Sequence, residues 1–302
     1  MGWKLILSLF FIFFSVIMLI IYWFIPYNLV DFEITPRNSN FSLGAITDMQ
    51  FYSNMRFPNP EISYKISDDC TLQKKRDMEQ GLEIIANRTL LDFYPVINNE
   101  EISINCESKN KIEEGLFIAG EGGPTNITKT NNFNVILHGQ ILLIRDSSCQ
   151  SPNIAIHELL HVLGFDHSLN KQNIMYNISS CGQTIGEDMI YFINEIYKIP
   201  SYPDLLFENA SAIMRGKYLD VNLSIRNNGL KNSEETEIEI YANDNLIKSI
   251  DFDSLEIGYG RAISLSNIWV SQLNSNNLKF IISSDFSELD KENNIAELKI
   301  KE

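Results

Sequence analysis

The sequence predicts an apolar N-terminal helix, then a mixed α+β domain, then an all-β sandwich. Three observations predict this order. Residues 1–25 are dominated by one apolar run, residues 56–200 mix helical and alternating apolar spacing, and residues 203–302 consist of short alternating segments separated by turn signals. We expect the first segment to be an anchor, residues 26–55 to be a linker, and the last two segments to be separate domains.

The N-terminal apolar run is long enough to cross a bilayer as a helix. Leu5–Ile25 contains no charged residue, and a membrane span needs about 20 apolar residues. Lys4 precedes the run while Asp31 and Glu33 follow it, so the charge bias places the bulk of the protein outside. Secretion after signal cleavage is the alternative, but no small-x-small cleavage site follows the run. We favour a single-pass cell-membrane anchor with the C-terminal bulk facing the exterior.

The second segment alternates predicted strands and helices. Glu61–Ile66 alternates apolar and polar residues, as a strand does, and residues 71–91 carry apolar side chains near helical spacing. Glu101–Ile104 predicts a second strand, Gly115–Ala119 a third, and the apolar run Val135–Ile144 a strong fourth strand.

The chemistry of the chain is concentrated in residues 157–167, which read HELLHVLGFDH and hold three of the four histidines. Two histidines four residues apart lie on one face of a helix and can bind one ion. Gly164 ends that helix, because glycine tolerates the left-handed backbone, and the chain can then turn back. His157, His161 and His167 are therefore the predicted ligands of one catalytic zinc, with a fourth position open for water.

Glu158 is the predicted general base, because it follows the first ligand and can point at the zinc-bound water. A helix that merely carries histidines is the alternative, but a chance match to five fixed positions is about one in a million. We predict a zinc-dependent endopeptidase in which Glu158 assists the attack of zinc-bound water on a peptide bond. The alternative function is a catalytically inactive surface binding or adhesion protein on a peptidase fold.

The long motif resembles that of the metzincin metallopeptidases, and its continuation is similar to the matrixins, the matrix-metalloproteinase group. Ser168 follows the third histidine, and Met175 stands where these enzymes have the Met-turn beneath the zinc. The resemblance covers about residues 56–200 and implies a mixed sheet with three main helices. It also implies that Tyr176 and Asn177 line the pocket for the substrate side chain just beyond the cleavage point.

Further expectations follow from the same resemblance. Some metzincins use a tyrosine ligand two residues after the methionine, where this chain has Asn177, so we expect none. The edge strand before the zinc helix binds peptide by strand addition in these enzymes, and Val135–Ile144 is the strong strand upstream of that helix. Structural calcium is expected without named ligands, and His138 alone does not predict a second zinc. Gly120–Pro124 is interpreted as a connection near the substrate cleft.

Four cysteines lie within the predicted peptidase domain. An even count in an exported domain suggests two disulfides with three possible pairings, and free buried cysteines are the alternative. A bond between Cys149 and Cys181 would clamp the zinc site from both sides, which leaves Cys70 with Cys106. We expect these two bonds, since the predicted compartment is oxidising.

The last segment predicts six or seven short strands, as in an antiparallel sandwich. Leu219–Arg226 alternates apolar and polar residues, and Asn227-Asn228-Gly229 is a turn signal. Together with Pro203-Asp204-Leu205 and Glu292-Asn293-Asn294, this segment resembles the CARDB family of immunoglobulin-like domains. The resemblance implies a spacer or an adhesion module on a surface protein, and both roles stay open.

The net charge of −15 argues against binding to nucleic acid, whose partners need a basic face. The predicted partners are a protein or peptide substrate and, through the N-terminal helix, the lipid bilayer. The oligomeric state is not predicted.

Overall fold

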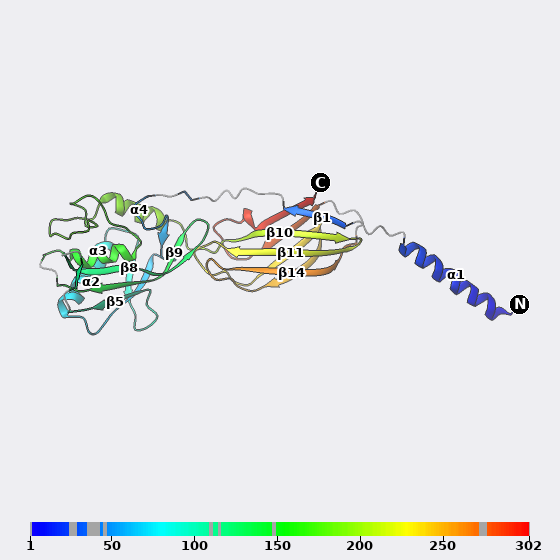
Figure 1. Ribbon diagram of the computed structural model, residues 1–302, viewed down its shortest axis with the longest axis horizontal. Coiled ribbons are helices and arrows are strands. Elements are labelled where there is room, and N and C mark those ends of the chain that lie inside the picture. Colours follow the sequence, from blue (N-terminus) through cyan, green and yellow to red (C-terminus); the bar gives the residue numbers. More distant parts are fainter. Residues whose placement is uncertain are drawn as a thin grey trace.

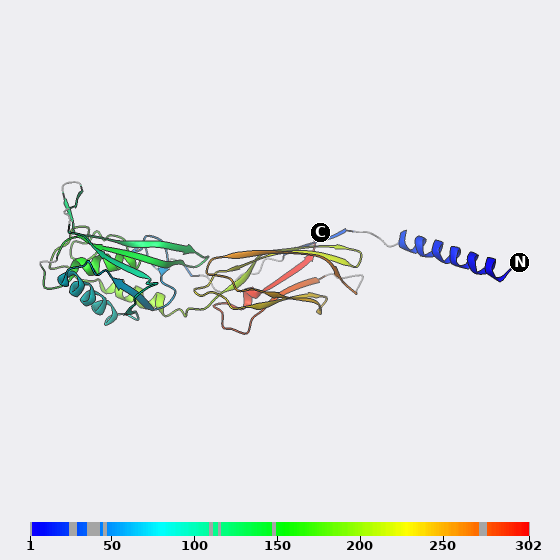
Figure 2. The same ribbon diagram turned by 90° about the horizontal axis from the view of Figure 1, so that it is seen from below.

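The computed structural model of the chain forms three parts in a row. The apolar helix lies at one end, an antiparallel sheet in the middle and a mixed α/β part at the other end (Figure 1). The turned view shows the same order, with the helix apart from both sheets (Figure 2). The structure describes residues 2–23, 29–34, 43–44, 47–108, 111–113, 116–146, 149–271 and 277–301.

Helix α1 (Trp3–Trp23) covers most of the predicted anchor. Its apolar side chains are exposed, among them Phe10 and Phe14, whose rings stack on each other. Across the described part of the chain, no helix fulfils the length and apolarity needed to cross a membrane. Residues 24 and 25, at the end of the predicted anchor, lie outside the described residues.

The mixed part is built on a six-stranded sheet with three helices, so the predicted combination of a mixed sheet and helices is confirmed. The strand order is β2-β9-β5-β3-β4, with β8 paired to β9; only the β8–β9 pair is antiparallel. The sheet contains β2 (Met55–Arg56), β3 (Glu61–Ile66), β4 (Asp92–Pro95), β5 (Ile102–Cys106), β8 (Gly120–Lys129) and β9 (Asn134–Leu143). The other elements are the helices α2 (Leu72–Ala86), α3 (Asn153–Val162) and α4 (Glu187–Tyr197) and the hairpin β6 (Lys111–Glu113) with β7 (Leu116–Ile118).

Local sequence explains how α2 forms, and α3 is the buried helix of this part. Thr71 caps α2, because its side chain accepts the N–H of Lys74 at 3.3 Å. Met78, Leu82 and Ile85 recur at helical spacing and pack into the core of this part. α3 is buried along nearly its entire length, so its polar residues are held inside the protein.

The interpretation of Gly120–Pro124 as a connecting loop is wrong, because this segment is the first half of β8. A Cβ on Gly122 would collide with the carbonyl oxygen of Glu158 in α3, and a Cβ on Gly139 of β9 would collide with the side chain of Val162. Glycine is therefore required by the close approach of the sheet to α3, rather than by a turn.

The all-β part confirms the predicted sandwich. Its strands follow the order β13-β12-β15-β16-β1-β10-β11-β14, and the sheet folds over one apolar core until its edge strands β13 and β14 touch. The elements are β1 (Leu29–Ile34), β10 (Leu205–Arg215), β11 (Tyr218–Asn227), β12 (Thr236–Ala242), β13 (Asn245–Phe252), β14 (Gly260–Trp269), β15 (Asn277–Ser283), η1 (Glu292–Asn294) and β16 (Ile295–Ile300).

Strand β1 lies in the segment that the sequence predicts to be a linker. It pairs antiparallel with β10 on one side and with β16 on the other, and Figure 1 shows it beside the C-terminus. Phe32 is only 3% exposed and belongs to the sandwich core, whereas Glu33 pairs with Lys301 at the surface (2.8 Å). Residues 35–42 of the predicted linker lie outside the described residues, and the domain boundaries stay a prediction.

Arg56 holds the end of the mixed part where the chain leaves for the sandwich. It is fully buried, and its guanidinium donates to the carbonyls of Ile196 (2.6 Å) and Ile199 (2.9 Å), beyond which the chain continues to β10. The same guanidinium lies over the ring of Tyr197, 4.4 Å from its centre. The guanidinium thus satisfies carbonyls at the end of α4 and fixes the start of the connection.

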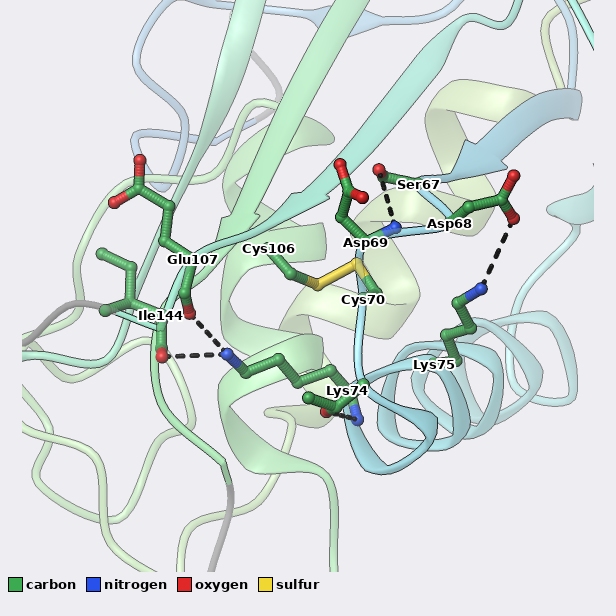
Figure 3. The surroundings of a disulfide bond; sticks show 10 residues. Ser67, Asp68, Asp69, Cys70, Lys74, Lys75, Cys106, Glu107 and Ile144 are labelled. Carbon is green, nitrogen blue, oxygen red and sulfur yellow. Dashed lines mark hydrogen bonds and ion pairs between the residues drawn. A yellow bond between two sulfur atoms is a disulfide. The ribbon is translucent and has the colours of Figure 1, made fainter.

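A disulfide joins Cys70, just before α2, to Cys106 at the end of β5 (Figure 3). Next to it, the ammonium group of Lys74 donates to the carbonyls of Glu107 (2.6 Å) and Ile144 (3.0 Å). The start of α2 is therefore tied to the sheet both covalently and through hydrogen bonds. Such a bond stabilises the fold by about 2–4 kcal/mol, mainly by restricting the unfolded chain.

Candidate zinc centre and substrate cleft

The three predicted ligands come together at one point. His157 and His161 lie one turn apart on α3, and Gly164, with φ of +96°, ends the helix so that the chain returns with His167. The Nε2 atom of His161 lies 3.0 Å from that of His157 and 3.2 Å from that of His167. Across the described residues, no other group of three histidine, cysteine or acidic side chains converges in this way.

The opposite ring nitrogens show which tautomer the histidines adopt. Nδ1 of His157 lies 2.6 Å from the carbonyl oxygen of Ile174, and Nδ1 of His161 lies 2.8 Å from that of Phe165. A carbonyl only accepts, so each Nδ1 carries the proton and each Nε2 presents a lone pair. Such carbonyl partners typically orient metal-binding histidines.

This arrangement fits a zinc ion. Tetrahedral Zn–N bonds of about 2.0–2.1 Å place ligand nitrogens about 3.3 Å apart, close to the separations found here. Burial lowers the pKa of His161 to about 4, with a further contribution from His157, and burial also lowers the pKa of His157. Both imidazoles are therefore neutral at neutral pH, which is the form that binds metal.

Glu158 lies on α3 beside the first ligand and reaches toward β8. A Cβ placed on Gly120 would lie 2.8 Å from Oε1 of Glu158, so the carboxylate lies next to the first residue of that strand. Burial and, secondarily, the charge of Glu121 raise the pKa of Glu158 to about 8. A nearby cation favours the ionised form, so zinc bound by the histidines counteracts this shift.

The zinc ligands line a cleft of about 1030 Å³. The start of β8 forms one wall, and the segment after Met175 forms another. Asn177 lines this second wall, and Tyr176 does not. Met175 itself is buried, and its carbonyl oxygen accepts the N–H of Ser168 at 2.8 Å. The structure thus brings Asn177 to the cleft and leaves Tyr176 half-buried beside it.

A second disulfide, Cys149–Cys181, joins the chain before α3 to the segment after Met175. Asn153 at the start of α3 donates to the carbonyl of Ser180 at 2.7 Å and strengthens the same connection. The prediction of disulfide bonds is confirmed, and no cysteine is free in the part of the chain that the structure describes.

One residue of the cleft carries no recognisable signal in the sequence. Phe51 lines the cleft and stacks on His161, with ring centres 5.7 Å apart and planes at 21°. Its backbone N–H donates to the carbonyl of Gly164 at 2.9 Å, which joins this N-terminal segment to the end of the zinc helix. This contact depends on tertiary structure, so no local pattern predicts it.

Replacing Gly122 by alanine is expected to destabilise the protein by about 1–3 kcal/mol, the usual range for overpacking, and to lower activity by displacing Glu158. The control is Gly123→Ala, because a Cβ at Gly123 meets nothing within 4 Å. Thermal unfolding and peptide hydrolysis measured on both variants check this expectation. Equal effects of the two substitutions would contradict the close packing of β8 on α3.

Comparison with known proteins agrees with this geometry. The sequence profile of the Astacin peptidase family matches residues 49–214, more than half of the chain, and the CARDB profile matches residues 202–298. None of the curated proteins compared matches the chain. A solved structure that is similar is the CARDB domain of a protein from Pyrococcus furiosus in complex with di-metal ions. It has 17% sequence identity and a TM-score of 0.28, over 33% of this chain and 88% of that chain.

Helix α3 presents two histidines, the returning chain delivers a third, and the family profile covers this part of the chain. These features define a metzincin zinc metalloendopeptidase, with catalytic zinc bound by His157, His161 and His167. The chain belongs to the astacin family of peptidases, and a CARDB domain follows its peptidase domain. The metzincin prediction is confirmed, but the narrower assignment to matrixins is not supported, because it depended on a few residues around the third histidine and Met175.

Proposed function

We propose that this peptidase acts at the cell surface, anchored by its N-terminal segment, with Glu158 as its general base. The observation that carries the catalytic proposal is the position of Glu158. Its carboxylate lies between the zinc ligands on α3 and the start of β8, in the cleft. Apart from the zinc ligands, Glu158 is the only residue of the motif that lines the cleft.

The chain's own residues divide the reaction between them. Zinc held by the histidines supplies a Lewis acid that polarises the peptide carbonyl and acidifies water. Glu158 takes a proton from the attacking water and passes it to the leaving amine, so that one carboxylate serves as base and then as acid. The carbonyl of Ile174, directly before Met175, orients His157, so this segment supports the first ligand.

We assign substrate binding to β8 instead of the strand Val135–Ile144. β9 pairs with β5, β2 and β8, so it lies inside the sheet, whereas β9 is the only partner of β8 among the strands that the structure describes. The start of β8 also lines the cleft. An extended peptide can add to such an edge through backbone hydrogen bonds. The substrate side chain beyond the cleavage point then faces the wall that contains Asn177, while Tyr176 stabilises that wall from behind.

The location proposal combines two features. The two disulfides suggest an extracellular address, because such bonds persist in oxidising compartments. The uncharged apolar run Leu5–Ile25 supports a membrane anchor with the bulk of the protein outside. Secretion after removal of this run is the second candidate.

Membrane fractionation separates these two locations. We expect the full chain to stay with membranes after carbonate washing and a variant without residues 2–25 to be released. N-terminal sequencing of the exported protein gives the control, because a signal peptide would leave a new N-terminus after the apolar run. Such an N-terminus would contradict the anchor.

The catalytic proposal is tested by hydrolysis of casein. The full chain is expected to cleave casein. Its activity is expected to be lost when a chelator removes zinc and to return when zinc is added back. A surface binding protein without activity is the alternative, and intact casein despite one bound zinc per chain would favour it. A chelator-resistant hydrolysis would instead identify a contaminating protease.

A further inference from the structure

We propose that the substrate-binding edge of β8 stops at Pro124, so that the cleft recognises the backbone of only about three residues on the amino-terminal side of the cleavage point. This inference rests on the proposed function and adds a substrate length to it. It follows from the direction in which each backbone group of β8 points, which the hydrogen bonds of the neighbouring strand determine.

The neighbouring strand β9 shows which residues of β8 face its free edge. Gly139 donates its N–H to Glu101 next to β5 (2.8 Å), and the carbonyl of Leu143 accepts an N–H just beyond β5 (3.0 Å). Gly139 and Leu143 therefore face β5 and turn away from β8. Residues opposite each other in an antiparallel pair face either toward or away from each other together. Pro124 pairs with Gly139, and Gly120 with Leu143, so both point to the free edge.

A bond at the start of the strand gives the same alternation. The carbonyl of Ala119 accepts the N–H of Ile144 at 3.0 Å, so Ala119 faces β9. Every second residue after it then faces β9 as well, which includes Gly123. The groups at the free edge are consequently those of Gly120, Gly122 and Pro124.

These three residues do not offer the same bonds to a substrate. Gly120 and Gly122 each present an N–H and a carbonyl, whereas Pro124 has no N–H and presents a carbonyl only. Gly120 and Gly122 also line the cleft, and Pro124 does not. The register of β8 shifts directly after Pro124, between Pro124 and Asn126, so the regular edge ends there.

The position of Glu158 indicates which residue of the free edge lies level with the bond that is cleaved. Gly120 lies beside the carboxylate, so it is roughly level with the bond that is cleaved. An antiparallel substrate advances one residue per residue of β8, with its amino-terminal half toward Pro124. The substrate carbonyl about four residues upstream of the cleavage point then lies opposite Pro124, which has no N–H to donate. A proline at this position also protects the edge from pairing with long strands.

A peptide length series tests the proposal with the full chain. One casein peptide with a mapped cleavage site is synthesised in six lengths, with one to six residues on the amino-terminal side of the cleavage point. The third and all further upstream residues are alanine. In the wild type, kcat/KM is expected to rise up to about three upstream residues and then to stay level. In Pro124→Ala, the regained N–H is expected to raise the ratio of long to short peptide by about 2- to 10-fold, the value of one hydrogen bond.

Gly123→Ala is the matched control. It also places an alanine in β8, one residue away, but its backbone faces β9, so the ratio of long to short peptide should equal that of the wild type. Thermal unfolding of both variants verifies that neither disturbs the fold. A ratio that rises equally in both variants would overturn the proposal.

Binding separates this proposal from the catalytic one. The same peptides, fluorescently labelled, are titrated against Glu158→Gln by anisotropy, so that length dependence is measured without turnover. Affinity that levels off at about three upstream residues supports an edge that stops at Pro124, even if the wild type cleaves no peptide. The absence of cleavage would then contradict the catalytic proposal alone. Affinity that keeps rising through six upstream residues, or that does not depend on length at all, would overturn the proposal that the edge stops at Pro124.

Discussion

Replacing Glu158 by glutamine is expected to lower kcat by about 100- to 10,000-fold, the usual loss when a general base is removed. Glutamine fills the same space beside Gly120 but does not accept a proton from water. Zinc binding should persist, because the ligands are histidines and glutamate is not among them. Steady-state hydrolysis and metal analysis of the same preparation check both parts of this expectation.

The matched control for this substitution is Glu121→Gln. Glu121 lines the same cleft and lies near enough to Glu158 to raise its pKa. It carries no step of the proposed reaction, so its loss should change kcat by less than about tenfold. Full turnover in Glu158→Gln, or an equal loss in both variants, would remove Glu158 from its assigned role.

Replacing His161 by alanine is expected to abolish activity by removing the metal. His161 lies between the other two ligands, within 3.0 Å and 3.2 Å of their Nε2 atoms, so its loss leaves only two protein donors. Zinc sites need three or four ligands for stable binding. We expect about one zinc per chain in the wild type and only traces in the variant, by atomic absorption after dialysis.

The fourth histidine provides the control. His138 in β9 contacts the hydroxyl groups of Thr125 (2.7 Å) and Ser103 (3.0 Å), away from the zinc ligands. His138→Ala should therefore retain zinc and activity. Both disulfides and the apolar core should keep His161→Ala folded, which circular dichroism verifies. Zinc retained by a folded His161→Ala variant would contradict the three-histidine site.

The zinc ligands could be predicted from sequence because their geometry is local. Two histidines four residues apart share a helix face whatever surrounds them, and Gly164 marks the end of that helix. The Met175 region was also recognisable from its spacing. The assignment to a family needed more, because a short run around the third histidine does not distinguish the groups of metzincins that share it.

The parts that sequence did not predict depend on contacts between distant segments. The glycines of β8 resemble a loop in sequence, but they are required by the proximity of α3. The apolar run Val135–Ile144 predicts a strand but not its neighbours, and the pairing of β9 with β2, β5 and β8 is what places it inside the sheet. β1 alternates over too few residues for a strand to be distinguished from a linker, and Phe51 contacts its histidine from more than a hundred residues away.

The pairing of β1 with β16 determines the order in which the chain can fold during synthesis. The mixed sheet and its helices all lie between Met55 and Tyr197, so they leave the ribosome before β10 and can fold first. Phe32, however, is opposite Ile300, which is synthesised after the entire peptidase domain. The sandwich therefore closes only after β16 has been synthesised, and such distant pairings form slowly. If translation stopped before Ile295, the peptidase could fold, but β1 and β15 would each lack β16 on one side and expose that side as an unpaired edge.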